Sequence, residues 1–266
     1  MDKLIELLLV YQALEINGVI DHERFNLIAI DHHSTRIEGS TLTEIETQIL
    51  INEGRTPNGK PLHESLMVTD HHKALLFTLT NAREGKKPTV ELLKKINALV
   101  MQNTGNIYNT VFGSIDAKTG AFRKGNVTAG SSYFPNFDKV ERLTNDLILH
   151  LQNAMQPGAT ITDQLNLSFD AHFNLVSIHP FYDGNGRTSR LLMNYIQAYY
   201  QLPLAIVLSE NKVAYIQALV TAREEENIQI FRDFMIGEYS GLLRNEINKF
   251  EKMKNPAKGK GFNLLF

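Results

Sequence analysis

Reactive side chains are concentrated at positions 179–190, where the chain runs HPFYDGNGRTSR. His179 has an ordinary pKa of about 6.5, so near neutral pH it is mostly unprotonated and able to accept a proton from a hydroxyl group. Asp183 is a carboxylate of the kind that Mg²⁺ accepts together with phosphate oxygens. The segment therefore combines a candidate general base with a candidate metal ligand.

A glycine turn follows this carboxylate. Gly184 and Gly186 would each cost about 1 kcal/mol relative to alanine inside a helix, so their positions around Asn185 predict positive φ angles or a close approach of the backbone. Apolar residues then repeat at helical spacing over 191–199, and the turn is expected to open a helix. Because a helix N-terminus presents unpaired N–H groups and partial positive charge, this turn is a candidate anion site.

Two arginines lie in the first turns of that predicted helix. Arg187 and Arg190 are three residues apart and share one face, and the guanidinium group binds phosphate through paired hydrogen bonds. Cations near a helix N-terminus cost a few tenths to about 1 kcal/mol, which a bound polyanion would offset. A P-loop pattern is absent. Arg187 stands where a calcium loop needs Asp or Asn, and Asn194 stands where it needs Glu. The residues alone still allow a plain glycine turn with a buried histidine and surface arginines.

Composition narrows the class of protein. The chain has 266 residues, a net charge of −2 and no cysteine, which allows a sizeable core and excludes disulfides and thiolate metal sites. The charge argues against a protein that binds nucleic acid mainly through phosphate contacts. No apolar stretch is long enough to span a membrane, and residues 1–10 are expected to form a helix rather than a signal peptide. We therefore expect a cytoplasmic protein with no nucleic-acid or membrane partner.

Hydrophobic periodicity predicts an all-α fold with one short β-hairpin. Residues 103–137 interrupt the helices and are expected to form a loop and a hairpin that turns at Lys124-Gly125-Asn126. A helix from near residue 22 is expected to end at Gly39, and the next one to start with a capping box at Thr41–Glu44 or Thr43–Glu46. The helices are expected at 43–53, 66–83, 90–102, 138–154, 162–178, 186–201, 211–225 and 228–252.

The pattern HPFxDGNGRxxR at 179–190 resembles the full signature of the Fic family, and residues 171–178 resemble the helix that leads into it. The similarity covers roughly residues 100–235. It implies a Fic-type helical bundle with a β-hairpin flap, and the transfer of AMP from Mg-ATP to a Ser, Thr or Tyr hydroxyl of a target protein. The target is expected to dock on the flap near residues 120–137 by strand addition. A homodimer is left open as the oligomeric state.

The resemblance also assigns a role to each residue of the motif by its position. His179 would be the catalytic base. ATP and its Mg²⁺ would be held by Asp183 as the metal ligand, by Gly184, Asn185 and Gly186 as the anion hole, and by Arg187 and Arg190 at the outer phosphates.

A second motif, Ser34-x-x-x-Glu38-Gly39, ends the helix expected from residue 22. A carboxylate in the last helical turn is disfavoured by several tenths of a kcal/mol, so Glu38 is either exposed at that small cost or paired with a cation elsewhere. The motif resembles the inhibitory-helix motif [ST]-x-x-x-E-[GN] of many Fic proteins, in the class with an N-terminal inhibitory helix. It implies that Glu38 pairs with Arg190 and blocks the γ-phosphate position.

Together these features divide the chain into an N-terminal helical region at 1–60 with the inhibitory helix, a Fic domain at 61–253 with its core at 100–235, and a flexible tail at 254–266. The expected function is a protein adenylyltransferase, an AMPylation enzyme autoinhibited by Glu38. Three alternatives remain: a nucleotide-binding regulatory protein held inactive, a Fic enzyme that removes AMP, and one that uses another donor.

Other polar residues are expected to be structural. The adjacent pairs His32–His33 and His71–His72 are interpreted as surface or half-buried, because neighbours on a helix point about 100° apart and share no metal face. His172 is expected to be a packed core histidine. Asn211 and Tyr215 are expected to pack helices, with an adenine pocket as the alternative.

Overall fold

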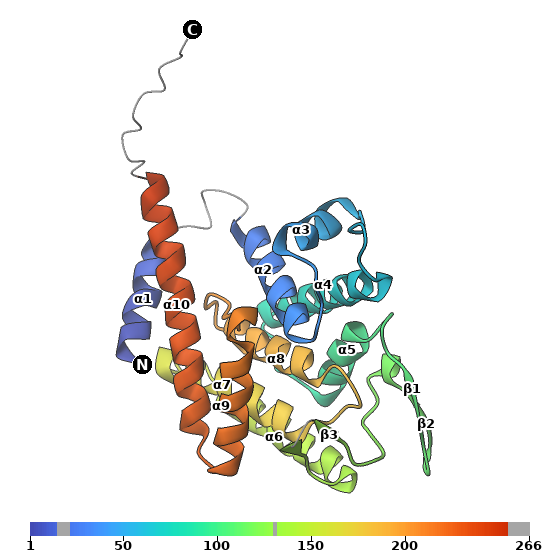
Figure 1. Cartoon of the computed structure of the whole chain (residues 1–266). Helices are drawn as coiled ribbons and strands as arrows, with labels where there is room; N and C mark the ends of the chain where they lie inside the picture. The colour runs from blue at the N-terminus through green and yellow to red at the C-terminus, as the bar shows by residue number, and fades with distance from the viewer. Residues whose placement is uncertain (15–21, 130–131, 255–266) are drawn as a thin grey trace.

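A computed structural model describes residues 1–14, 22–129 and 132–254. The fold is mostly helical, as predicted, and Figure 1 shows the order of its elements. The N-terminal half contains α1 (Asp2–Ala13), α2 (His22–Ile37), α3 (Glu44–Glu53), α4 (Leu62–Arg83) and α5 (Val90–Val100). The C-terminal half contains α6 (Phe137–Ala154), α7 (Ile161–Ile178), α8 (Asn185–Tyr199), α9 (Lys212–Glu224) and α10 (Ile228–Lys254). The predicted tail lies outside the described residues from position 255 onward.

Helix α8 runs through the middle of the molecule (Figure 1). Its apolar face contributes Leu191, Leu192, Tyr195 and Ile196 to a core shared with α4, α5, α6 and α7, and each of these side chains is at most 1% exposed. A second apolar cluster joins α1, α9 and α10 to the other side of α7. Because α8 is covered on all sides, the arginines in its first turns are buried as well. Within the described parts of the chain, every helix is too short or too polar to cross a bilayer.

Two antiparallel hairpins occupy residues 107–133, where the sequence predicted one. The unpredicted hairpin pairs β1 (Ile107–Thr110) with β2 (Gly113–Asp116), and it turns at Gly113, whose φ is 100°. The other pairs β3 (Thr128–Ala129) with β4 (Ser132–Tyr133) across residues 130–131, which lie outside the described set.

The predicted hairpin turn at Lys124–Asn126 is therefore wrong. This stretch leads into β3 and is pinned there, because the carbonyl of Gly125 accepts a hydrogen bond from Arg123. The side-chain carbonyl of Asn126 accepts another from the Phe137 amide at the start of α6. The contacts with the Arg123 side chain and with the start of α6 replace the hairpin turn that the sequence suggested.

The start of α3 confirms one of the two predicted capping boxes. The Thr43 hydroxyl accepts a hydrogen bond from the Glu46 amide, and the Glu46 carboxylate accepts one from the Thr43 amide. Thr41 instead donates its amide and hydroxyl to the buried carboxylate of Glu64 on α4. The connection between α2 and α3, which contains Glu38, is thus tied to α4.

A buried carboxylate joins α2 to α4. Asp31 is fully buried, and its two oxygens each lie 2.6 Å from an imidazole Nδ1, one of His71 and one of His72. Both histidine pairs were predicted to be surface or half-buried. His72 is half-buried as predicted, but His32, His33 and His71 are buried, so the prediction is wrong for these three. Adjacent helical side chains diverge, but one carboxylate between two helices reaches both rings. The Asp31 carboxylate raises the pKa of His72 against the opposing effect of burial.

Replacing Asp31 with alanine is expected to lower the free energy of unfolding by about 3 kcal/mol, because it leaves two imidazoles without their partner in a buried site. Urea unfolding at pH 7 measures this change. The exposed Glu6→Ala is the matched control and should change the stability by less than about 0.5 kcal/mol. Equal stability of the two variants would show that the Asp31 contacts do not hold α2 against α4.

Candidate active site

The junction between α7 and α8 presents an imidazole at the end of a helix. His179 ends α7 in the left-handed region, with φ 53° and ψ 58°, a conformation that costs a non-glycine residue about 1–2 kcal/mol. Arg123 stabilises it, because its Nε donates to the His179 carbonyl at 2.8 Å and its amide donates to the Pro180 carbonyl. The chain therefore turns sharply after His179 and leads directly into the glycine turn.

The ring of His179 has distinct surroundings at its face and at its edge. Its face stacks on Phe134, with ring centroids 3.9 Å apart and an interplanar angle of 20°. Its Nδ1 lies 3.4 Å from the Val176 carbonyl, and the tautomer that donates there leaves Nε2 as a proton acceptor. Burial lowers the pKa of His179 to about 4, assisted by the positive charges of Arg123 and Arg223. The ring is therefore neutral at neutral pH.

In an NMR titration, the ring signals of His179 are expected to move near pH 4 rather than near pH 6.5. Because the folded state binds the proton more weakly than the unfolded chain, the stability linked to this neutral ring is complete above about pH 6.5. It is lost as the pH falls toward the lowered pKa. Assignment uses the spectrum of His179→Ala. A titration near pH 6.5 would show that the ring is not shielded from water.

The glycine turn forms the mouth of an uncapped helix. Gly184 has a φ of 77° and precedes α8, whose N-terminus receives no side-chain cap. A Cβ at Gly184 would lie 2.8 Å from the Met101 sulfur and 2.9 Å from the Asn97 amide nitrogen, so only glycine fits. Asn97 in turn donates to the carbonyl of Asp183 and to the hydroxyl of Thr188. These contacts fix the turn at the start of α8, where unpaired helix N–H groups are suited to an anion.

The two arginines of the motif have different partners. Arg187 is 3% exposed, its Nε has no hydrogen-bond partner among the described residues, and its Nη2 lies 3.5 Å from the Asp183 carboxylate. A buried donor of this kind is costly unless an anion completes its shell. The Asp183 side chain is 43% exposed and accepts a bond from the Gly184 amide. An incompletely paired guanidinium and an accessible carboxylate therefore lie together at the start of α8.

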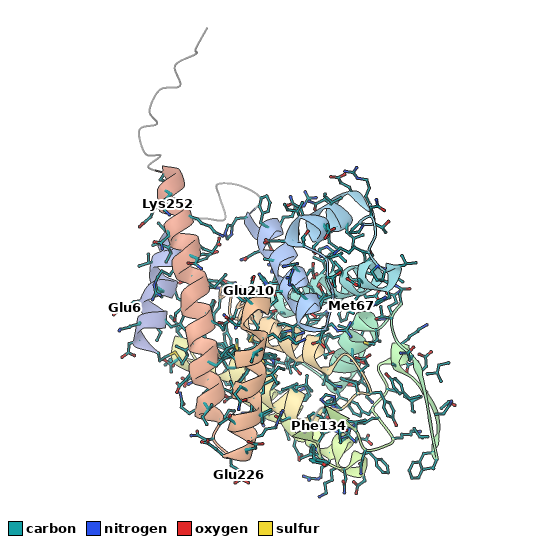
Figure 2. All side chains as sticks on the ribbon, viewed as in Figure 1. Glu6, Met67, Phe134, Glu210, Glu226 and Lys252 are labelled. Atoms are coloured by element: carbon teal, nitrogen blue, oxygen red, sulfur yellow. The ribbon has the colours of Figure 1, made fainter. Side chains whose placement is uncertain are left out.

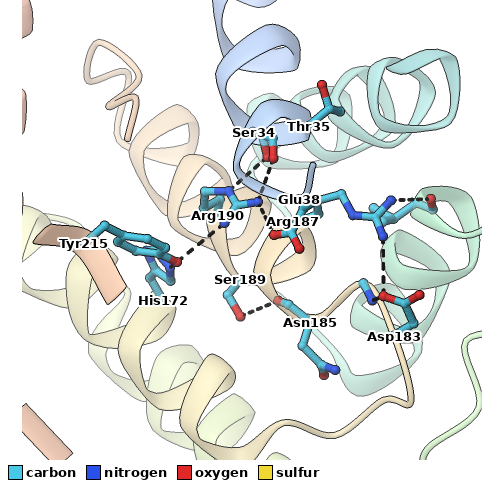
Figure 3. Close-up of polar contacts among 12 residues, drawn as sticks. Ser34, Thr35, Glu38, His172, Asp183, Asn185, Arg187, Ser189, Arg190 and Tyr215 are labelled. Carbon is cyan, nitrogen blue, oxygen red and sulfur yellow. Dashed lines mark hydrogen bonds and ion pairs between the residues drawn. The ribbon is translucent and has the colours of Figure 1, made fainter. Parts of the chain in front are cut away.

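Arg190, by contrast, forms hydrogen bonds with Ser34 on α2 and with Glu38 just after that helix, as Figure 3 shows. Its Nε donates to the Ser34 hydroxyl at 2.9 Å, and its Nη2 donates to the Ser34 carbonyl at 2.9 Å and to Glu38 Oε1 at 2.7 Å. The Tyr215 hydroxyl lies 3.5 Å from Nη1. The positions predicted to pair, Glu38 and Arg190, are therefore in contact across 152 residues of sequence.

The carboxylate of Glu38 lies over the N-terminus of α8. A Cβ on Gly186 would come within 2.5 Å of Glu38 Oε1, so glycine makes room for the carboxylate. Burial raises the pKa of Glu38, but the Arg190 guanidinium outweighs it and holds that pKa below its ordinary value. The prediction that Glu38 lies in the last turn of α2 is wrong by one residue, since α2 ends at Ile37. The Glu38 carboxylate, which is disfavoured near the C-terminus of α2, is thus stabilised at the N-terminus of α8.

Glu38, His179, Gly186 and Arg190 line a cleft of about 350 Å³ together with Phe134 of the flap and residues of α9. Asp183 and Arg187 are not among the residues that line it. Helix α9 contributes Lys212, Tyr215 and Arg223 to its wall. A larger hollow of about 470 Å³ lies elsewhere and contains none of the motif residues. Across the described ranges, no group of three or more His, Cys, Asp or Glu side chains is arranged to hold a metal ion by itself. A cation here would need oxygens from a ligand in addition to the protein.

Three residues expected to have structural roles, His172, Asn211 and Tyr215, lie in or near the core around the cleft. His172 is a buried core histidine, as predicted, and its Nε2 lies 2.8 Å from the Tyr215 hydroxyl. Tyr215 both packs against this core and lines the cleft. Asn211 donates to Glu238 on α10 and fastens helices together. Two residues of the site were not predicted: Asn97, which binds the Asp183 carbonyl, and Phe134, which stacks on His179.

Comparison with known proteins shows what part of this chain is similar to. Residues 87–197 match the Fic/DOC family. The protein adenylyltransferase Fic of Drosophila melanogaster is 29% identical over 198 residues, which is 73% of this chain and 37% of that protein. The chain therefore spans little more than a third of the length of the curated relatives that it matches. Part of the chain is thus similar to the Fic/DOC family, with distant homology to protein adenylyltransferases.

Solved structures show the same fold. A Fic-domain signaling protein from Bacteroides thetaiotaomicron has a TM-score of 0.78 at 20% identity, covering 94% of this chain and 98% of that one. Fic-1 from C. elegans, residues 134–508, has a TM-score of 0.74 at 21% identity, covering 94% of this chain and 72% of that one. The predicted Fic-type helical bundle with a β-hairpin is thereby confirmed.

Proposed function

We propose that this protein transfers AMP from Mg-ATP to a hydroxyl group of a target protein, and that Glu38 holds the reaction in check. The observation that carries the proposal is the Glu38 carboxylate at the N-terminus of α8, 2.7 Å from Arg190. The Glu38 carboxylate lies beside Arg190 and Gly186, where we propose that the phosphates of ATP bind. The adenylyltransferases among the relatives support AMP as the transferred group.

The chemistry assigns the proton and the leaving group. His179 Nε2 removes the proton of the incoming hydroxyl as its oxygen attacks the α-phosphorus of ATP. The bond from that phosphorus to the oxygen bridging the β-phosphate breaks, and pyrophosphate leaves. The α8 N-terminus and Arg187 hold the phosphates, which supplies the anion that the buried Arg187 Nε lacks. Pairing with phosphate also offsets the cost of cations at a helix N-terminus.

Asp183 is the proposed ligand of Mg²⁺. Its carboxylate is partly exposed next to the anion-binding turn, and a site with one protein carboxylate fits Mg²⁺, which takes its remaining oxygens from phosphates and water. When bound, the ion would neutralise phosphate charge. The 3.5 Å contact between Asp183 and Arg187 keeps this carboxylate at the edge of the turn.

Autoinhibition follows from competition for one guanidinium. Ser34 accepts from Nε and from Nη2 of Arg190, and Glu38 accepts the second Nη2 hydrogen bond. An outer phosphate gains that Nη2 donor only when Glu38 withdraws. The target is proposed to dock along the flap near residues 120–137, where the Tyr133 side chain is 84% exposed. AMP removal is a second candidate activity, because Glu38 lines the same cleft as His179 and is able to orient a water there.

Two labelled forms of ATP test the proposed donor chemistry. The Glu38→Gly protein is incubated with Mg²⁺ and ATP labelled at either the α- or the γ-phosphate. We expect protein-bound label from the α-labelled form alone. Label from the γ-form would show phosphate transfer, label from neither would favour a regulatory nucleotide-binding protein, and a different adduct in the mass spectrum would show another donor. Each of these outcomes would overturn the proposal.

A further inference from the structure

We propose that Phe134 is a positioning residue for His179, whose ring it holds so that Nδ1 faces Val176 and Nε2 remains free for the target hydroxyl. This role rests on the proposed function of His179 as the base. Phe134 follows β4 at the end of the flap, beside the helical body (Figure 2). Neither aromatic character nor spacing in the sequence pointed to it.

The stacking contact with Phe134 restrains the His179 ring, which its long hydrogen bond to Val176 holds only weakly. The 3.4 Å separation between His179 Nδ1 and the Val176 carbonyl is longer than the ordinary range for an N–H···O bond. The parallel contact with Phe134, at 3.9 Å and 20°, covers the ring face and opposes rotation of the imidazole. Both ring nitrogens lie at the edge of the ring. Stacking therefore restrains the base without covering the atom that receives the proton.

Arg123 explains why Phe134 arrives at this position. Arg123 is 2% exposed, and its guanidinium donates to the carbonyls of Gly125, Pro135 and His179. One buried side chain thus ties both ends of the flap to the backbone of the base. Phe134 immediately precedes Pro135, so its place along the flap is set by the same guanidinium.

Arg223 of α9 completes the enclosure, with its guanidinium carbon 5.7 Å from the centroid of the Phe134 ring. The charged groups that act on His179 are Arg123 and Arg223, which lower its pKa, and Glu38, which raises it. Burial has the largest effect on that pKa, and Phe134 supplies part of the cover. Removing the ring should therefore loosen the base and hydrate it at the same time.

The test compares three variants in the Glu38→Gly protein: Phe134→Ala, Phe134→Tyr and the matched control Phe112→Ala. Phe112 is 58% exposed at the tip of the β1–β2 hairpin, where its ring contacts Phe137. For Phe134→Ala we expect the NMR pKa of His179 to rise from about 4 toward its ordinary value. The labelling rate at saturating ATP should fall about tenfold, while the ATP concentration for half-maximal rate is unchanged.

Phe134→Tyr should restore both the rate and the low pKa, and Phe112→Ala should alter neither. Should Phe134→Ala unfold, Phe134→Leu keeps the apolar bulk without the flat ring and is expected to show the same two changes. An unmoved His179 titration in a folded Phe134 variant would overturn the positioning role. The NMR titration of His179 does not depend on catalysis. It therefore tests the positioning role of Phe134 even if the Glu38→Gly parent incorporates no AMP and the proposed function fails.

Discussion

Replacing Glu38 with glycine is expected to raise the rate of self-modification by α-labelled ATP at least about tenfold, the effect of removing roughly 1.4 kcal/mol of competition. The substitution frees the Arg190 donor that Glu38 Oε1 now accepts at 2.7 Å, and it removes the carboxylate over Gly186. The anion-binding turn of α8 is then open to the phosphates of ATP. The measurement is the initial rate of label incorporation at equal protein concentration.

Two further substitutions separate charge from general disturbance. Glu38→Gln keeps the shape of the side chain but loses its charge, and we expect a rate between those of the native protein and Glu38→Gly. Glu226 is exposed and has a φ of 51°, a conformation that glycine adopts readily, so Glu226→Gly serves as the control. If folded Glu38→Gly labels no faster than Glu226→Gly, the inhibitory role of Glu38 is wrong.

Replacing His179 with alanine in the Glu38→Gly protein is expected to lower the labelling rate by about 10²- to 10⁴-fold, the usual contribution of a general base. The loss should fall on the chemical step. Because the imidazole contacts the Phe134 ring and the Val176 carbonyl, whereas the phosphates are proposed to bind Arg187 and the α8 amides, calorimetric ATP binding should persist. Rate and binding are measured on the same preparation.

His150→Ala, which removes an exposed imidazole from α6, is the control for histidine substitution and should leave the rate unchanged. A His179→Ala protein that still labels within about threefold of its parent, well inside the range expected for a lost base, would show that another group takes the proton. A protein that loses ATP binding as well would instead assign His179 to the binding of nucleotide.

The sequence was sufficient for the parts of the site that are local in the chain. His179, Asp183 and the glycine turn lie within one short segment, and their geometry follows from the positive φ of Gly184 and the helix that begins after it. The contact of Glu38 with Arg190 was also predicted, because a short motif and a helix-end carboxylate pointed to the same pairing.

Contacts made by remote residues could not be predicted in the same way. Arg123 binds three backbone carbonyls, and no sequence pattern marks a carbonyl as a partner. The same holds for Asn97, which fastens Asp183 from another helix. The burial of His71 was misjudged because helical geometry describes how neighbouring side chains diverge. The Asp31 carboxylate that reaches both His71 and His72 belongs to a different helix.

The most direct test of AMP transfer under the control of Glu38 is the intact mass of three proteins after incubation with Mg-ATP: native, Glu38→Gly, and Glu38→Gly with His179→Ala. We predict a mass increase of one or more AMP groups in Glu38→Gly, far less in the native protein, and none in the double variant. No adduct in folded Glu38→Gly, or an equal adduct in all three proteins, would contradict AMP transfer under the control of Glu38.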